Sequence, residues 1–336
     1  MPSTDLPTVP FGRTDLAITR VGFGAWAIGG AGWSFGWGSQ DDEESAAAIR
    51  RAIEGGVNWL DTAAVYGLGH SEEVVGRTLA DYPDTDRPYV FTKCGMVWDP
   101  GETTPRRQAT PESIRREVDD SLRRLRLDRI DLYQVHWPPD GDVPLERYWQ
   151  AMLDLVAAGK VRAVGLSNHD VKQLEAAEAL GHVDSLQPPY SAIDRDAAAD
   201  LIPWCAEHET AVIVYSPMQS GLLTGAFDEE RAANLPDDDW RSRSEDFTGD
   251  GLRRNLALAD ALRPLAERHG VPLPAVAVAW TLATKGVTGA IVGARRPEQV
   301  TGWLPAASLQ LTGADLDEIA GAIARTGAGH GPARSR

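Results

Sequence analysis

The feature that most constrains this chain is a regular alternation of short β-branched runs with longer amphipathic segments. Eight short runs have the residue types and lengths of strands, at 21–25, 58–61, 89–93, 130–136, 161–167, 185–188, 211–215 and 287–292. Seven segments of helical period lie between them, near 42–54, 72–79, 111–125, 145–158, 171–180, 200–208 and 255–269. Strands joined by crossover helices pair in parallel, so the sequence predicts an α/β fold. Eight such units without a break in composition favour a closed (β/α)8 TIM barrel over an open doubly wound sheet.

Turn and capping residues support these boundaries within a single domain spanning residues 1–336. Gly55-Gly56 is placed to end one helix, and Thr110-Pro111 is placed to begin another. Before the barrel, which we assign to 21–307, residues 8–20 are predicted to form a short β-hairpin. After it, residues 314–326 are expected to form an extra C-terminal helix and 327–336 a flexible Gly-rich tail. The long connections at 26–40 and 220–251 are expected to carry function.

Composition excludes several classes of function. The 336 residues carry a net charge of −16, which disfavours nucleic acid or an anionic membrane as the main partner. No apolar run has membrane-spanning length, and the N-terminus lacks the apolar core of a signal peptide. Cys94 and Cys205 are too few for a disulfide framework or a zinc cluster, so we expect no metal and a reducing compartment. These features predict a cytoplasmic protein that acts on a small molecule. Separately from composition, we expect a monomer.

Polar residues close most of the predicted strands. In chain order, from the second strand onward, these closing residues are Asp61, Lys93, His136, Ser167-Asn168, Gln187 and Tyr215-Ser216, and the eighth strand leads into Gly293-Ala294-Arg295. The C-terminal ends of the strands form the active site in barrels of this kind. The sequence therefore predicts one site that brings these side chains together.

The first of these residues indicate acid–base chemistry. A buried Lys93 needs a counter-charge, which Asp61 on the neighbouring strand can provide. A tyrosine hydroxyl such as that of Tyr66, with an ordinary pKa of about 10, donates a proton poorly at neutral pH unless a cation stabilises the phenolate. We expect Lys93 to be that cation. His136, fixed by the Trp-Pro-Pro that follows it, is expected to orient a carbonyl oxygen.

The segments that contain these residues resemble the aldo-keto reductases over nearly the whole chain. They are LDTAAVYG at 60–67, FTKCG at 91–95, QVHWPP at 134–139, VGLSN at 164–168, QPPYS at 187–191, YSPMQSGLLTG at 215–225 and IVGAR at 291–295. The resemblance implies an NADP(H)-dependent oxidoreductase that reduces an aldehyde, ketone or sugar carbonyl to the alcohol by hydride transfer. Tyr66 matches the family's proton donor, Asp61 and Lys93 the pair that tunes it, and His136 the residue that hydrogen-bonds the carbonyl oxygen.

The resemblance also implies a cofactor site. Ser167, Asn168 and Gln187 would hold the nicotinamide carboxamide, and Tyr215 would stack on the ring. Ser216, Met218, Ser220, Gly221 and Leu222 would wrap the pyrophosphate, with Gly293 nearby. Arg295 would grip the adenosine 2′-phosphate, which favours NADP(H), and Gln299 would contact the adenosine. The family often has an acidic residue and an asparagine next, but this chain has Gly302 and Trp303, which leaves the preference between NADP and NAD open. Trp26 and Trp98, with His136, would line the substrate mouth.

Three other interpretations fit parts of the sequence. Residues 22–27, GFGAWA, match the fingerprint of a Rossmann dehydrogenase, although the glycines that follow make a poor helix. A regulatory subunit of the same fold, like the potassium-channel β subunits, would retain the cofactor with little turnover. A barrel hydrolase would need a second carboxylate besides Asp61, and no other predicted strand ends in one. The complete set of four polar residues favours the reductase.

Overall fold

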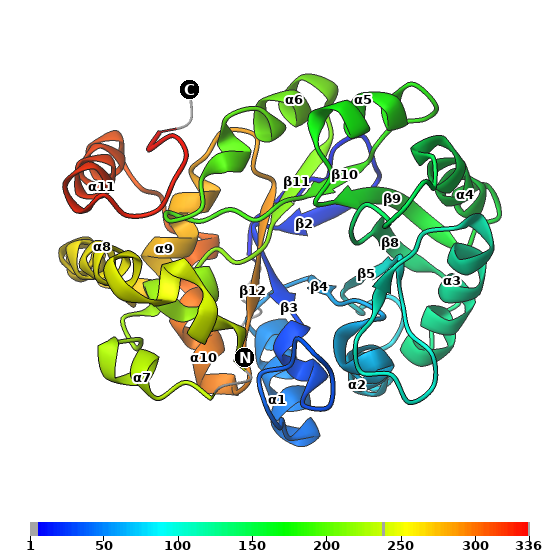
Figure 1. Ribbon diagram of the computed structural model, residues 1–336, viewed down its shortest axis with the longest axis horizontal. Helices are drawn as coiled ribbons and strands as arrows, with labels where there is room; N and C mark the ends of the chain where they lie inside the picture. The colour runs from blue at the N-terminus through cyan, green and yellow to red at the C-terminus, as the bar shows by residue number, and fades with distance from the viewer. Residues whose placement is uncertain (1–5, 237–238, 335–336) are drawn as a thin grey trace.

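Eight parallel strands form a closed barrel at the centre of the computed structural model, which describes residues 6–236 and 239–334 (Figure 1). Their order around the ring is β10-β11-β12-β3-β4-β5-β8-β9, so the pairing of β12 with β3 closes it. The barrel strands are β3 (Val21–Gly24), β4 (Trp59–Asp61), β5 (Tyr89–Cys94), β8 (Ile130–Val135), β9 (Val161–Ser167), β10 (Ser185–Gln187), β11 (Ala211–Val214) and β12 (Gly289–Gly293). Each coincides closely with a predicted strand, and the predicted TIM barrel is confirmed.

Helices surround the barrel as an outer ring (Figure 1). They are α1 (Asp42–Glu54), α2 (His70–Leu79), α3 (Pro111–Leu125), α4 (Leu145–Ala157), α5 (Val171–Glu178), α6 (Leu201–His208), α7 (Glu229–Ala233), α8 (Gly249–His269), α9 (Leu273–Leu282), α10 (Pro297–Trp303) and α11 (Gly313–Thr326). Among the described residues, none of these helices combines the length and apolar composition needed to span a bilayer. All predicted helical segments are present, but α7, α9 and α10 were not predicted. Every residue of α9 except Pro274 is buried, so its sequence lacks the polar face that reveals a helical period.

Local capping explains where two of these helices begin. The side chain of Asp41 accepts a hydrogen bond from the Glu44 amide at the start of α1. Thr110 accepts one from the Ser113 amide at the start of α3, where Pro111 occupies the first turn. Each cap satisfies an amide that has no partner inside the helix. The predicted start of the third helix at Thr110-Pro111 is confirmed.

The predicted hairpin precedes the barrel and closes one end of it. Its strands β1 (Thr8–Pro10) and β2 (Ala17–Thr19) pair antiparallel. Between and beside them, Phe11 and Leu16 pack with Trp59 and Phe91 in a cluster inside the barrel. A Cβ on Gly22 would come within 2.2 Å of the Trp59 ring, so only glycine fits there. The hairpin fills the end at which the strands begin, and the polar residues lie at the other end.

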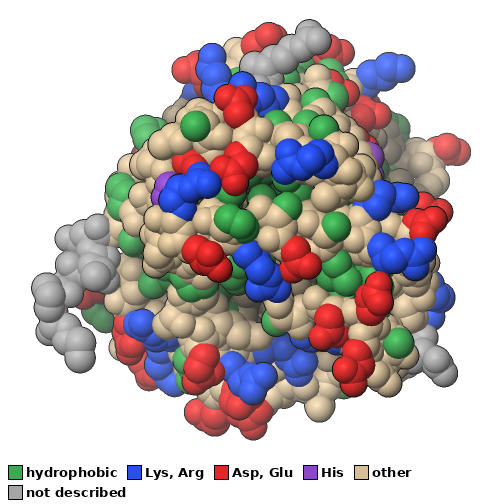
Figure 2. Space-filling view, turned by 90° about the vertical axis from the view of Figure 1, so that its left-hand side faces the viewer, with side chains coloured by type: hydrophobic (Ala, Val, Ile, Leu, Met, Phe, Trp, Pro, Cys, Tyr) green, Lys and Arg blue, Asp and Glu red, His purple; other side chains and the backbone are tan. Residues whose placement is uncertain are grey.

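The chain after the barrel packs against α8. In α11, Asp315 and Glu318 pair with Arg268 of α8 at 3.0 and 2.9 Å. Figure 2 shows this side of the molecule, on which acidic and basic side chains are interspersed. Two short strands outside the barrel, β6 (Met96–Val97) and β7 (Arg106–Arg107), pair antiparallel in a hairpin that begins just after β5.

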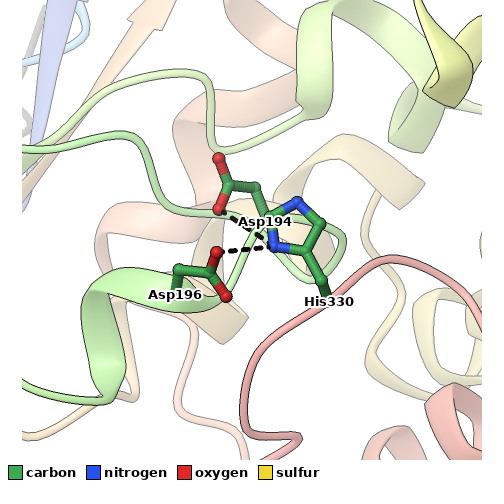
Figure 3. A group of neighbouring side chains, drawn as sticks. All are labelled: Asp194, Asp196 and His330. Carbon is green, nitrogen blue, oxygen red and sulfur yellow. Dashed lines mark ion pairs between the residues drawn. The ribbon is translucent and has the colours of Figure 1, made fainter.

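The segment after α11 contacts the loop that follows β10. The Arg195 guanidinium donates to the carbonyl oxygens of Ala328 and Gly331, each at 3.2 Å. His330 Nδ1 lies 3.0 Å from Asp196 Oδ2 and 3.9 Å from Asp194 Oδ1 (Figure 3). Within the predicted tail at 327–336, residues 328–331 have tertiary partners that the Gly-rich composition does not reveal. Residues 335–336 lie outside the described part of the chain.

Candidate active site

The ammonium group of Lys93 is the centre of a polar cluster at the C-terminal ends of the strands. Lys93 Nζ donates to Asp61 Oδ1 at 2.6 Å and to the Thr62 carbonyl at 2.9 Å, and it lies 3.4 Å from Tyr66 Oη. The side chains of Lys93 and Asp61 are 0% and 3% exposed, so they form a buried ion pair. Such a pair is costly to desolvate and is weak evidence for a stabilising role. The pair that the sequence predicted is present.

Two glutamine amides complete the surroundings of Asp61. Gln187 Nε2, at the end of β10, donates to Asp61 Oδ2 at 2.9 Å and lies 3.3 Å from Gln134 Oε1. Gln134 is aligned with Lys93 in the pairing of β5 with β8. Gln134 was not predicted from the sequence, and Gln187 was predicted only as a cofactor contact. A signal for Gln134 was available, because it precedes His136 at the alternate spacing that shares one face of a strand.

Tyr66 begins a tight turn in which backbone packs against backbone. It starts the short 3-10 helix η2 (Tyr66–Gly69), in which Gly67 has a φ of 60°. The 3-10 helix η1 (Trp26–Gly29) lies against this turn, and a Cβ on Gly67 would come within 2.1 Å of the Gly29 carbonyl oxygen. Both the positive φ and the lack of space require glycine. This contact fixes the turn that carries Tyr66.

Burial decides the protonation states in the cluster. It raises the pKa of Tyr66 well above its ordinary value, and the charge of Asp61 raises that pKa further. Burial lowers the pKa of Lys93 against the opposing effect of Asp61. The pKa of His136 is held well below its usual range by burial and then by the charges of Lys93 and Arg107. At neutral pH the cluster therefore presents a neutral phenol and a neutral imidazole. Lys93 Nζ lies 3.4 Å from Tyr66 Oη, and stabilisation of the phenolate by Lys93 stays a prediction.

His136 follows β8 and faces the tyrosine. The ring centroids of His136 and Tyr66 are 5.7 Å apart and the ring planes meet at 77°. The backbone N–H of His136 donates to the Cys94 carbonyl at 3.0 Å. Its Nδ1 is buried and has no hydrogen-bond partner among the described residues. The phenol and the imidazole can each direct one donor to the same acceptor atom.

A second hydrogen-bonded group joins the ends of β9, β10 and β11. Asn168 Nδ2 donates to the His136 carbonyl at 2.9 Å, and Tyr215 Oη donates to Asn168 Oδ1 at 2.8 Å. Ser167 Oγ donates to the Gln187 carbonyl at 2.9 Å. These contacts bring together the residues that the resemblance associates with the nicotinamide, directly beside the histidine.

The backbone after Tyr215 contains several left-handed residues. Ser216, Gln219 and Ser220 have φ angles of 55°, 45° and 49°, and Gly221 has 104°. Such conformations cost a non-glycine residue on the order of 1–3 kcal/mol and cluster at ligand sites. A Cβ on Gly221 would meet no atom within 4 Å, so this backbone borders open space. Leu222 is buried in the core and offers only its backbone. The loop fits an anionic group such as a pyrophosphate.

Arg295 follows β12 and contacts the loop between β3 and α1. Its guanidinium donates to Gln40 Oε1 at 2.6 Å, to the Ser39 carbonyl at 2.5 Å and to the Trp37 carbonyl at 3.4 Å. Gln299 Oε1 accepts from the Arg295 amide at 2.7 Å. No acid within the described residues forms an ion pair with Arg295, so its charge remains available to an anion. Sequence reasoning missed Gln40, whose contact with Arg295 depends on the path of a long loop.

Trp303 lies near the end of the expected cofactor segment but belongs to the core. It is 1% exposed in α10 and packs in the main hydrophobic cluster. Packing accounts for the tryptophan at this position, where the resemblance would place an asparagine.

Aromatic side chains border the polar cluster. Trp26, Trp98, Trp137 and Tyr66 pack around a small buried group that includes Trp33 and Met96. The Arg107 guanidinium lies 4.4 Å from the centroid of the Trp137 ring. Trp26 and Trp98 were predicted to line the substrate mouth, whereas Trp137 and Arg107 were not, although Trp137 directly follows His136.

The segment at 22–27 does not form a dinucleotide fingerprint. Gly22 and Gly24 lie inside β3, where Gly22 makes room for the Trp59 ring. The short η1 follows in place of the helix that the fingerprint requires, and Asp41 caps α1. The Rossmann alternative is therefore wrong.

Several known proteins are similar to this chain over most of its length. The sequence model of the Aldo/keto reductase family matches residues 20–324. The aldo-keto reductase YhdN of Bacillus subtilis (strain 168) is 36% identical over 297 residues, which cover 86% of this chain and 87% of the relative. The NADH-specific methylglyoxal reductase of Escherichia coli (strain K12) is 33% identical over 331 residues, which cover 94% and 99%.

Two solved structures are also similar to this chain over most of its length. The glycerol dehydrogenase AKR11B4 from Gluconobacter oxydans superposes with a TM-score of 0.86 at 36% identity, and the match covers 97% of each chain. The aldo-keto reductase AKR11C1 from Bacillus halodurans, in its holo form, superposes with a TM-score of 0.78 at 25% identity, over 94% of this chain and 96% of its own.

Proposed function

Because this chain belongs to the aldo/keto reductase family, we propose that it reduces the carbonyl group of a small aldehyde, ketone or sugar to an alcohol with NADP(H), and that Tyr66 donates the proton. One observation carries the proposal. Asp61, Lys93, Tyr66 and His136 form a single contact group at the C-terminal ends of the strands. We further propose that the chain acts as a monomeric, single-domain enzyme of the cytoplasm.

The protonation states support this division of roles. Tyr66 Oη would give its proton to the carbonyl oxygen as negative charge develops there, and neutral His136 would donate a hydrogen bond to the same oxygen. The phenolate left behind would face Lys93 Nζ, which lies 3.4 Å from Tyr66 Oη before the reaction. Asp61 would hold Lys93 in place and, through Gln187, would tie it to β10 on the opposite side of the barrel.

The cofactor site follows from the donor set. A bound nicotinamide cofactor would supply the hydride that the carbonyl carbon receives. Ser167, Asn168 and Gln187 would hold it near the ring, and the left-handed loop at 216–222 would hold its phosphates. Arg295, which has donors and no acidic partner among the described residues, would bind a 2′-phosphate and favours NADP(H). The Escherichia coli relative is named as NADH-specific, so both cofactors enter the test.

The aromatic side chains at the substrate mouth favour a small substrate. Trp26, Trp98 and Trp137 pack in one cluster with Tyr66, and we expect them to border the space that a small carbonyl compound would occupy beside Tyr66 and His136. Methylglyoxal and glycerol appear in the names of two relatives, and small aldehydes and hydroxyketones of that kind are the first substrates to test.

The test measures binding and turnover separately. Quenching of tryptophan fluorescence reports NADPH and NADH affinity, and loss of nicotinamide absorbance reports turnover on a panel of aldehydes, ketones and sugars. Tyr66→Phe should nearly abolish turnover while leaving NADPH affinity close to that of the parent protein. Arg295→Gln should weaken NADPH binding and leave NADH binding unchanged. Tight binding without turnover on any carbonyl would support a regulatory subunit, and unchanged turnover in Tyr66→Phe would remove the tyrosine from the mechanism.

A further inference from the structure

One buried acid behind the barrel has no part in the chemistry proposed above. Glu117 lies on the face of α3 that is otherwise lined by buried residues such as Ile114, Val118 and Leu125. It is 8% exposed, and glutamate is seldom buried to this extent without a partner. Its carboxyl group accepts a hydrogen bond from the Gly95 amide, with Oε2 at 2.8 Å from the nitrogen. An acid in this position therefore calls for a reason other than packing.

Gly95 explains why an acceptor is needed there. It follows directly after β5 and has a φ of 86°, so the chain turns away from the barrel at this residue. A buried amide at a strand end that finds no acceptor costs free energy comparable to a lost hydrogen bond. The carboxyl group of Glu117 supplies the acceptor from the outer layer of the fold.

The peptide group that contains the Gly95 amide also contacts the candidate active site. The N–H of Gly95 and the C=O of Cys94 belong to one planar peptide unit, and its oxygen accepts from the backbone N–H of His136 at 3.0 Å. Glu117 and His136 therefore hold the two ends of one peptide. The residue before this peptide is Lys93. Hydrogen bonds in such a chain polarise one another, so a charge at Glu117 strengthens the acceptor that His136 uses.

We propose that Glu117 is a positioning residue for the reduction, which holds the Cys94–Gly95 peptide and thereby sets His136 against the carbonyl oxygen and Lys93 against Tyr66. This inference rests on the proposed function for its effect on turnover. Its structural part, the link from the carboxyl group to the histidine backbone, does not depend on that function.

Ionisation of Glu117 provides a direct probe of the link. Burial raises the pKa of Glu117 to about 7, against the opposing effects of the Gly95 hydrogen bond and of Arg116 and Arg124. From the elements packed against α3, Cys94 of β5 and Tyr133 of β8 interact with the charge of Glu117, and Glu72 of α2 interacts with the same two groups. Burial holds the pKa of both Cys94 and Tyr133 well above their ordinary values, so neither titrates near neutral pH.

The first experiment follows amide resonances of Gly95 and His136 by NMR between about pH 5.5 and about pH 8.5. Both amides should shift together with one midpoint near the pKa of Glu117, and both shifts should vanish in Glu117→Gln. The imidazole of His136 does not interfere, because its own pKa lies well below this range. A shift of Gly95 without a shift of His136 would overturn the link.

The second experiment measures turnover in two variants and a control. Glu117→Gln keeps an acceptor of the same shape and should retain kcat within about threefold, whereas Glu117→Leu should lower kcat roughly tenfold or more with KM nearly unchanged. Val118→Ala, on the same buried face of α3, should lower the midpoint of urea unfolding without this loss of kcat. Equal kcat in all variants would overturn the positioning role. Linked amide shifts in a protein that reduces no carbonyl would instead refute the proposed function and leave the link intact.

Discussion

Replacing Lys93 with methionine would leave the carboxylate of Asp61 without its cationic partner inside the barrel. Methionine keeps an unbranched side chain but lacks the ammonium group, so Asp61 Oδ1 would lose its bond of 2.6 Å while Gln187 continued to donate to Oδ2. Breaking a buried ion pair from one side costs about 3–5 kcal/mol. The free energy of unfolding of a native domain is only about 5–15 kcal/mol, so this single change should remove a large part of it.

Adding Asp61→Asn to Lys93→Met should recover most of that loss, because no unpaired charge then remains. Urea unfolding followed by tryptophan fluorescence, for the parent, both single variants and the double variant, gives the coupling free energy. Turnover should remain lost in the double variant, because the proposed partner of Tyr66 is still missing. Asp131→Asn provides the control, since Asp131 pairs with Arg87 and Arg162 at the start of β8 and should affect stability alone.

The dependence on pH supplies a second check. Burial raises the pKa of Asp61 even beside Lys93, and the variant removes the charge that opposes this rise. A carboxyl group whose pKa is higher in the folded state favours folding at low pH, and this contribution is lost as the pH rises through the folded pKa. The stability deficit of Lys93→Met should therefore shrink between about pH 7 and about pH 5, while the double variant shows no such change. Equal losses of unfolding free energy in Lys93→Met and in the double variant at both pH values would refute the reasoning.

Three further predictions test other parts of the site. Gly67→Ala should lower kcat roughly tenfold with little change in NADPH affinity, because its Cβ would meet the Gly29 carbonyl oxygen within 2.1 Å and displace the tyrosine turn; unchanged steady-state kinetics would contradict this. The imidazole carbon resonances of His136 should stay constant between about pH 6 and about pH 8, because burial keeps its pKa well below the usual range, and a titration in that window would show a solvated ring. Arg107→Gln should raise KM several-fold for an aldehyde that carries a carboxylate but not for its neutral counterpart, since Arg107 lies over an aromatic ring of the mouth. Arg106 provides the control because its guanidinium already pairs with two acids, so Arg106→Gln should change KM for neither aldehyde.

The barrel and the list of polar strand ends could be predicted because both depend on local patterns. Parallel strands place their C-terminal ends at one rim, so Asp61, Lys93 and His136 had to meet once the strands were counted correctly. The helix α9 escaped detection for the opposite reason, since burial on all sides erases the periodicity that marks a surface helix.

The details that sequence reasoning missed depend on contacts between distant segments. Burial and the charge of Asp61 raise the pKa of Tyr66, and no pattern in the sequence measures these effects. Gln40 contacts Arg295 only because the loop from β3 to α1 folds over the end of β12. Glu117 could not be assigned to the site from its own surroundings in the sequence, because its partner is an amide on another element.

The closure of the ring by β12 and β3 ties completion of the barrel to the synthesis of β12. Val21 pairs with Ala290, so the edge of β3 that faces away from β4 stays unpaired until β12 has left the ribosome. Until then the growing sheet has open edges, which in other proteins recruit further strands and cause aggregation. A product truncated before Gly289 would therefore be an aggregation hazard as well as an inactive enzyme, and slower translation of the last segment would prolong the exposure of those edges.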